Sequence, residues 1–114
     1  MNSVLKTLVK GIHHFNTEIA QPNNSFFKKL SKAQKPLALF ITCSDSRIDP
    51  NLLTQTDPGI LFSIRNPGNI VPKYTSNHHA SETAAIEYAI EGLGIEEIII
   101  CGHTNCGAMK ALLY

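Results

Sequence analysis

The sequence predicts an α/β fold of three layers, in which helices flank a central, mainly parallel β-sheet. Three short apolar runs, at 37–41, 60–64 and 95–101, have the length and composition of buried strands. Segments with helical or irregular patterns separate these runs, and strands joined by such connections pair in parallel. Parallel sheets gather their ligands at the carboxyl ends of the strands, so functional residues are expected directly after the runs.

Length and composition set the bounds. With 114 residues, of which 43% are hydrophobic, the chain is long enough for one small domain with a packed core. A net charge of +1 and the lack of a basic stripe argue against a nucleic acid partner. The sequence has no apolar run of about twenty residues, so no membrane-spanning helix is expected. We expect a single domain over 1–114.

A helical arm is expected at about 1–34. Apolar residues recur with helical spacing from Val4 to Ile19, and a polar break follows. A second helix then begins at Phe26, with Ser25 as its N-cap. Both helices are interpreted as packing elements rather than binding sites.

The cysteine pattern indicates a reduced compartment. Three cysteines at irregular spacing do not form a disulfide framework, so their thiols are free to bind metal. Lys6 and Lys10 interrupt the apolar positions near the N-terminus, which is not the pattern of a signal peptide. A cytoplasmic location is therefore predicted.

The elements after the second strand are less regular. The run 60–64 ends in a turn that contains Gly68. A helix is expected from about Ser81 to Glu91. After the third strand, Thr104 or Asn105 opens a last helix.

Two clusters of possible metal ligands follow the first and third strands. Cys43 comes directly after the first, and His103 and Cys106 come after the third. Cys106 is expected in the first turn of the last helix, where the dipole and free N–H groups favour a thiolate. A lone His-x-x-Cys is weak evidence, but two thiolates and an imidazole at neighbouring strand ends suit Zn²⁺. Cys101 lies inside an apolar strand and is expected in the core.

Asp45 and Arg47 add a carboxylate and a guanidinium beside the first cysteine. In an extended chain, both would point to the same side as Cys43. Three protein ligands leave a fourth zinc position for water, whose pKa zinc lowers to ~7. Asp45 either fills that position or, held by Arg47, accepts a hydrogen bond from the water. The bland alternative is an ion pair that only ties down a loop, and spacing alone does not separate the two.

Four motifs carry a resemblance to a known family. They are Cys-Ser-Asp-Ser-Arg at 43–47, Arg-Asn at 65–66, Ala-Ile-Glu-Tyr-Ala at 85–89 and Gly-His-Thr-Asn-Cys-Gly at 102–107. From about Leu8 onward, the chain resembles the β-class carbonic anhydrases. The resemblance implies reversible hydration of carbon dioxide to bicarbonate, with zinc on Cys43, His103 and Cys106. It also implies that Asp45 and Arg47 act as the catalytic pair.

The resemblance further implies a set of substrate-binding residues. Gln34 matches a glutamine nine residues before the first cysteine, and Phe62 and Tyr88 match pocket aromatics. The N–H of Gly107 matches a backbone donor to substrate. In the family, residues such as Gln34, Phe62 and Tyr88 come from a second subunit. A homodimer or a higher homo-oligomer is therefore expected.

Three departures from the family pattern matter. Phe40 stands where some bacterial members have the tryptophan of an inhibitory bicarbonate site, and Pro67 replaces a small aliphatic residue of the pocket. Family members are also longer, and this chain stops at Tyr114 inside its last helix. We therefore expect a truncated β-carbonic-anhydrase-like domain.

Two rival functions stay open at this stage. The same site on the same scaffold suits hydrolysis of carbon disulfide or carbonyl sulfide. Alternatively, the chain is a zinc-binding or interaction remnant without turnover. No proton shuttle is identified, and His78 and His79 are interpreted as surface residues.

Overall fold

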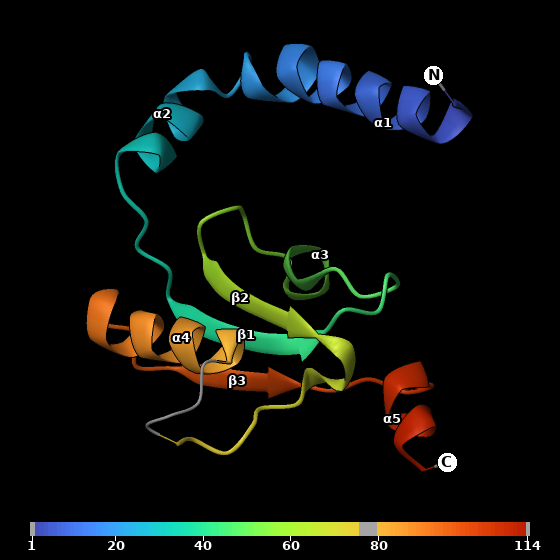
Figure 1. The fold of residues 1–114 in the computed structure, drawn as a ribbon. Coiled ribbons are helices and arrows are strands. Elements are labelled where there is room, and N and C mark those ends of the chain that lie inside the picture. Colours follow the sequence, from blue (N-terminus) through green and yellow to red (C-terminus); the bar gives the residue numbers. More distant parts are fainter. Residues whose placement is uncertain (1, 76–79, 114) are drawn as a thin grey trace. The chain divides into compact units, whose positions relative to one another are not determined.

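The computed structural model describes residues 2–75 and 80–113, so His78 and His79 lie outside the described residues (Figure 1). The chain divides into two compact units, at 1–34 and 35–114. The first unit is helical and the second contains the sheet. None of the helices within the described ranges combines the length and the apolar character that crossing a bilayer requires.

The helical unit contains α1 (Ser3–His14), a π-helical segment η1 (Phe15–Ala20) and α2 (Asn24–Lys32). Asn2 caps α1, because its Oδ1 accepts a hydrogen bond from the N–H of Leu5 at 2.9 Å. The predicted N-cap of the second helix is wrong: α2 begins one residue before Ser25, and Asn23 takes the cap position. The ring of Phe27 stands edge-on to that of Phe15, with centroids 5.6 Å apart, and so joins α2 to η1.

The second unit confirms the predicted α/β fold class. Strands β1 (Ala38–Cys43), β2 (Leu61–Asn66) and β3 (Ile98–Cys101) form a parallel sheet in the order β2-β1-β3. The central strand β1 is buried along its whole length. The strands point their carboxyl ends toward the end of the sheet where α5 lies (Figure 1).

Helices and turns fill the connections between strands. They are α3 (Pro50–Thr54), the 3₁₀ turn η2 (Pro67–Asn69), α4 (Ser81–Glu87) with its π-helical continuation η3 (Tyr88–Gly92), and α5 (Gly107–Leu112). The third strand begins at Ile98, three residues later than predicted, because the N–H of Ile95 bonds to the carbonyl of Ala89. Ile95 therefore packs under the end of η3 instead of pairing in the sheet.

The core joins one face of the sheet to α4 and η3. Its buried members are Leu39, Ile41, Ile64, Ala89 and Ile95. Leu39 is fully buried, and full burial of such a side chain contributes about 1.5–3 kcal/mol. The core therefore fixes β1, whose last residue is Cys43.

The third strand is exposed in spite of its apolar pattern. Ile98, Ile99 and Ile100 are 48%, 44% and 60% exposed. Cys101, predicted in the core, is only partly buried. In the described part of the chain, β3 pairs with β1 on one side and with no strand on the other. It is an apolar edge strand.

This edge predicts self-association. An unpaired apolar edge favours pairing with other chains, so residues 1–114 should form species larger than a dimer as concentration rises. Ile100→Lys removes an apolar side chain worth about 1.5–3 kcal/mol on burial, so association should weaken roughly 10–100-fold. Sedimentation velocity over a concentration series measures this. Leu52→Lys, at a similarly exposed position on α3, is the matched control. Equal association of both variants and the wild type would contradict the prediction.

Candidate metal centre

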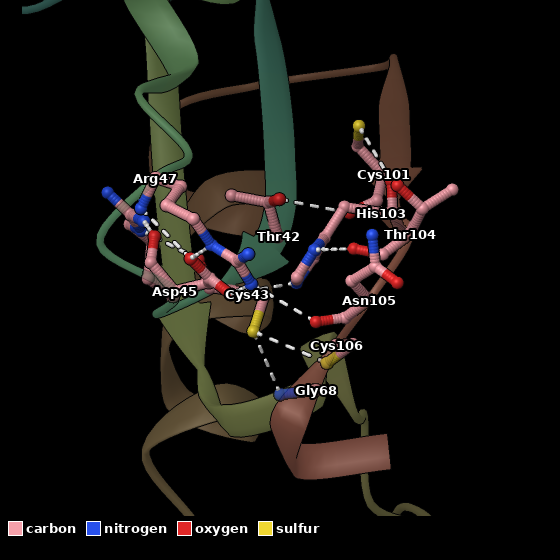
Figure 2. A network of polar contacts seen from close by, with 12 residues as sticks. Thr42, Cys43, Asp45, Arg47, Gly68, Cys101, His103, Thr104, Asn105 and Cys106 are labelled. Carbon is pink, nitrogen blue, oxygen red and sulfur yellow. Dashed lines mark hydrogen bonds and ion pairs between the residues drawn. The ribbon is translucent and has the colours of Figure 1, made fainter. Parts of the chain in front are cut away.

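The ends of β1 and β3 bring the three predicted zinc ligands together. Sγ of Cys43, a ring nitrogen of His103 and Sγ of Cys106 all lie within 4.8 Å of one another, and the two sulfurs are 3.9 Å apart (Figure 2). The parallel register places Thr42 beside Cys101, so both strands end at the same edge. The Thr42 hydroxyl donates to the carbonyl of Cys101 at 2.9 Å and ties the two ends together.

His103 offers a lone pair to this cluster. Its Nδ1 lies 2.8 Å from the carbonyl oxygen of Thr104. Because a carbonyl only accepts, Nδ1 carries the hydrogen and Nε2 is left as the acceptor. Nε2 is buried and has no hydrogen-bond partner in the described structure. An unpaired buried nitrogen beside two thiols, with its other nitrogen fixed by a carbonyl, fits a tetrahedral zinc site.

The Cys43 thiol is prepared to ionise. The N–H of Gly68 donates to its sulfur at 3.3 Å. This N–H, followed by His103, lowers the pKa of Cys43 to about 7. In turn, the neighbouring thiolate and the Thr104 carbonyl raise the pKa of His103. The turn η2 thus supports the metal centre from the side of β2.

Gly68 is needed for this contact. Its φ of +82° lies in the left-handed region that favours glycine. A Cβ at this position would also lie 3.2 Å from Cε of Met109 in α5. Sequence reasoning placed a turn at Gly68 but gave it no part in the site. A glycine after Asn-Pro was the available signal for the turn, and nothing in the pattern pointed to the sulfur.

Cys106 stands one position before the helix in which it was predicted. It is the N-cap of α5, with extended φ and ψ of −74° and 115°, and its side chain makes no capping bond. Asn105 turns the chain with a φ of +56°, a conformation that asparagine tolerates. This turn directs Cys106 toward Cys43 and leaves its thiol free for a metal.

Asp45 and Arg47 form a tight ion pair. Arg47 donates from Nε to Oδ1 at 3.0 Å and from Nη2 to Oδ2 at 2.7 Å, and its backbone N–H also reaches Oδ1 at 2.9 Å. These bonds hold the pKa of Asp45 well below its usual range. The strand ends at Cys43, and Asp45 and Arg47 lie in the following loop and turn. The prediction that Asp45 and Arg47 point to the same side because they alternate along a strand is therefore wrong, although the two side chains do lie together.

The ion pair lies beside the metal ligands. Oδ2 of Asp45 is 3.8 Å from Nε2 of His103. Nη2 of Arg47 also donates to the carbonyl of Asn105 at 3.1 Å, which joins the loop after β1 to the loop after β3 (Figure 2). The ion pair therefore connects its own loop to the loop that carries His103 and Cys106.

Asn66 belongs to the turn after β2 and to one of the four motifs, but the sequence assigned it no contact. Its Oδ1 accepts from the N–H of Ile70 at 3.0 Å, and its Nδ2 donates to the carbonyl of Ile70 at 2.7 Å and to Glu82 at 2.9 Å. These bonds close the turn that carries Gly68. An asparagine before Pro-Gly signals such a turn, but its contact with α4 has no sequence signal.

Two of the predicted substrate-binding residues, Phe62 and Tyr88, form a contact of their own. Phe62 and Tyr88 touch each other, with ring centroids 5.9 Å apart. Phe62 pairs with Leu39, four residues before Cys43, which is about 13 Å along a strand. Gln34 belongs to the helical unit. Gly107 follows Cys106 as the first residue of α5. The roles of all four stay predictions.

The comparisons with known proteins decide the family. A family model described as carbonic anhydrase matches residues 38–114. The chain is also 49% identical to a solved β-carbonic anhydrase, CcaA, with a TM-score of 0.93 over 97% of this chain and 53% of that one. The chain belongs to the β-carbonic anhydrase family. This membership and the Cys–His–Cys set together confirm the prediction of Zn²⁺ as the cofactor.

Curated carbonic anhydrases of two bacteria are similar to almost the whole of this chain. The carbonic anhydrase of Synechococcus elongatus is 50% identical over 109 residues, which are 96% of this chain and 40% of that protein. The carbonic anhydrase of Pseudomonas aeruginosa is 45% identical over 108 residues, or 95% of this chain and 49% of that one. The chain thus spans less than half the length of these curated relatives.

Proposed function

We propose that this chain catalyses the reversible hydration of carbon dioxide to bicarbonate and a proton. The observation that carries the proposal is the juxtaposition of the Cys43, His103 and Cys106 ligand atoms, within 4.8 Å, with the Asp45 carboxylate 3.8 Å from Nε2 of His103. Zinc held by the three ligands supplies a Lewis acid that makes water acidic near neutral pH. Asp45 and Arg47 are the proposed catalytic pair.

The ion pair prepares Asp45 to orient the reacting water. Arg47 supplies two hydrogens to Oδ1 and one to Oδ2, so Oδ2 retains the capacity to accept another. Because the Asp45 carboxyl stays ionised at neutral pH, it accepts a hydrogen bond and donates none. It therefore favours a hydrogen-bearing ligand such as water and fixes its orientation. The guanidinium of Arg47 keeps the carboxylate from turning onto the metal.

A homodimer completes the proposed pocket. Phe62 and Tyr88 contact each other at a distance from Cys43 of their own chain, so we propose that they line the pocket of a second subunit together with Gln34. The N–H of Gly107, at the start of α5, is the proposed backbone donor to bicarbonate. One solved relative is described as a tetrameric β-carbonic anhydrase, at 34% identity and a TM-score of 0.87. A homo-oligomer built from dimers is accordingly proposed here.

The free thiols support a cytoplasmic location. Cys43, Cys101 and Cys106 are all unpaired, and the two that face the metal must stay reduced to bind it.

A stopped-flow assay tests the function. The zinc-loaded chain should hydrate carbon dioxide, and parallel assays with carbon disulfide and carbonyl sulfide should release no sulfide. The Cys101→Ser variant serves as the active control and Cys43→Ser as the inactive one. Sulfide release without hydration would assign the site to the rival hydrolase activity. Zinc binding without either activity would leave a non-catalytic metal-binding protein.

A further inference from the structure

Arg65 holds the backbone on both sides of Ser44. From its place on β2, opposite Thr42, it donates from Nε to the carbonyl of Cys43 at 2.9 Å. Its Nη2 donates to the carbonyl of Asp45 at 2.8 Å. One edge of a planar guanidinium thus binds two carbonyls that belong to a metal ligand and to a member of the catalytic pair.

This contact complements the one made by Arg47. Arg47 binds the Asp45 side chain by the same pair of nitrogens, Nε and Nη2. However, Arg47 lies two residues along the same loop, and its contact outside that loop is with the carbonyl of Asn105, which is also a loop residue. Arg65 belongs to the neighbouring strand β2, so its hydrogen bonds anchor the loop to the sheet.

Few other backbone bonds fix this loop. Within the described residues, the N–H of Ser44 bonds to the carbonyl of Asn66 at 2.8 Å, and the N–H of Ile48 bonds to Asp45. The Ile48 bond occupies one acceptor position of the Asp45 carbonyl, and neither bond reaches the carbonyl of Cys43. Arg65 binds both carbonyls from the neighbouring strand and so limits how far Asp45 can move relative to Cys43.

We propose that Arg65 is a positioning residue for the reaction, which keeps the Asp45 carboxylate at its distance from the metal ligands by binding the carbonyls of Cys43 and Asp45. This inference rests on the proposed function. Without Arg65 the loop after β1 is free to shift. The Asp45 carboxylate, already 3.8 Å from Nε2 of His103, then approaches the zinc and occupies the place of water.

The Arg65→Lys variant distinguishes positioning by hydrogen bonds from an effect of positive charge alone. Arginine presents rigid, coplanar donors, whereas the lysine ammonium is a point charge on a flexible stem. If Arg65 acted only by its positive charge, Arg65→Lys would retain its effect. If Arg65 acts by bridging two carbonyls, Arg65→Lys should behave almost as Arg65→Ala does.

The test compares the zinc-loaded chain with Arg65→Ala, Arg65→Lys and Lys73→Ala. Lys73 is an exposed cation outside the site, so its variant controls for the loss of one charge. Loss of a partner beyond the direct ligands costs about 10–100-fold in activity or metal affinity. We expect kcat to fall by that factor in both Arg65 variants, with KM changed by less than about twofold. Lys73→Ala should match the wild type.

Cobalt substitution supplies a readout that does not depend on turnover. In both Arg65 variants the visible absorption should shift as Asp45 enters the coordination shell, and adding Asp45→Asn should reverse the shift. Amide hydrogen exchange of residues 44–47 should also become faster. If Arg65→Ala fails to fold, Arg65→Lys carries the comparison.

The outcomes are distinct. Wild-type kcat and cobalt spectrum in Arg65→Lys would show that charge alone is used and would overturn the proposal. An unchanged spectrum and unchanged exchange in Arg65→Ala would overturn it as well. If the wild-type chain binds zinc but hydrates no carbon dioxide, the proposed function fails. The cobalt and exchange measurements still decide whether Arg65 positions the loop.

Discussion

Single replacement of Cys43, His103 or Cys106 will remove zinc from the chain, whereas Cys101→Ser will leave it bound. The three atoms form the described cluster of possible metal ligands, and Cys101 directs its sulfur to the carbonyl of Gly102 instead. Zinc sites of this kind bind with about 10–16 kcal/mol in total. Shared over four ligands, the loss of one costs roughly 3 kcal/mol, or about 100-fold in affinity.

Competition with a zinc-selective chelator measures the affinity of each variant. Zinc affinity should fall only when a predicted ligand is replaced, and not whenever a thiol is removed. Cys101→Ser and Cys43→Ser each replace one sulfur by oxygen, so they form a matched pair. Zinc loss from Cys101→Ser, or retention by Cys43→Ser, would refute the ligand assignment.

Breaking the Asp45–Arg47 pair should remove most of the carbon dioxide hydration activity. A positioned group that handles a proton contributes about 10²–10⁴-fold, so Asp45→Asn should lower kcat/KM by that factor while zinc stays bound. In Arg47→Ala the guanidinium no longer competes for the carboxylate and only the backbone N–H of residue 47 still binds it, so Asp45 should fill the fourth zinc position. Cobalt spectra of Arg47→Ala should then show a closed site at neutral pH.

A nearby carboxylate provides the control for this pair. Asp49 caps α3 by accepting a hydrogen bond from the N–H of Leu52 at 3.2 Å. Asparagine also caps helices well, so Asp49→Asn should retain wild-type activity. The double variant of Asp45 and Arg47 should be no worse than the poorer single variant, because the two residues act as a unit. A fully additive loss, or an open cobalt spectrum in Arg47→Ala, would contradict the proposed switch.

Much of this site was predictable because each strand run ends directly before its functional residues. The apolar runs locate the sheet, parallel connections align its carboxyl ends, and Cys43 and His103 follow from that alignment. The same reasoning misplaced Cys106 by one position, since helix starts depend on local turns such as the one at Asn105. It also placed Cys101 in the core, where the structure has it only partly buried, because an apolar pattern does not show whether other elements cover the strand.

The supporting contacts were beyond the sequence for a different reason. Arg65 binds backbone carbonyls on another strand, and Gly68 binds a sulfur by its N–H. Contacts made by a backbone group depend on strand register and turn geometry. The type of residue that makes such a contact does not reveal it in the sequence. The roles of Gln34, Phe62, Tyr88 and Gly107 come from resemblance alone, and a structure of the dimer with bicarbonate would test them.

The metal centre also has a consequence for how the chain folds. Cys43 and Cys106 are 63 residues apart in the sequence, so a metal bound to both acts as a cross-link around more than half of the chain. Long loops are costly to close, and a clip that spans one gains the most from holding it shut. Because the unfolded chain does not present its ligands together, binding adds to stability by about 2.7 kcal/mol when free zinc is 100 times its dissociation constant. Within the described residues β3 is exposed, so a zinc ion bound to Cys43 and Cys106 would also stabilise the fold by linking the end of β1 to the loop after β3.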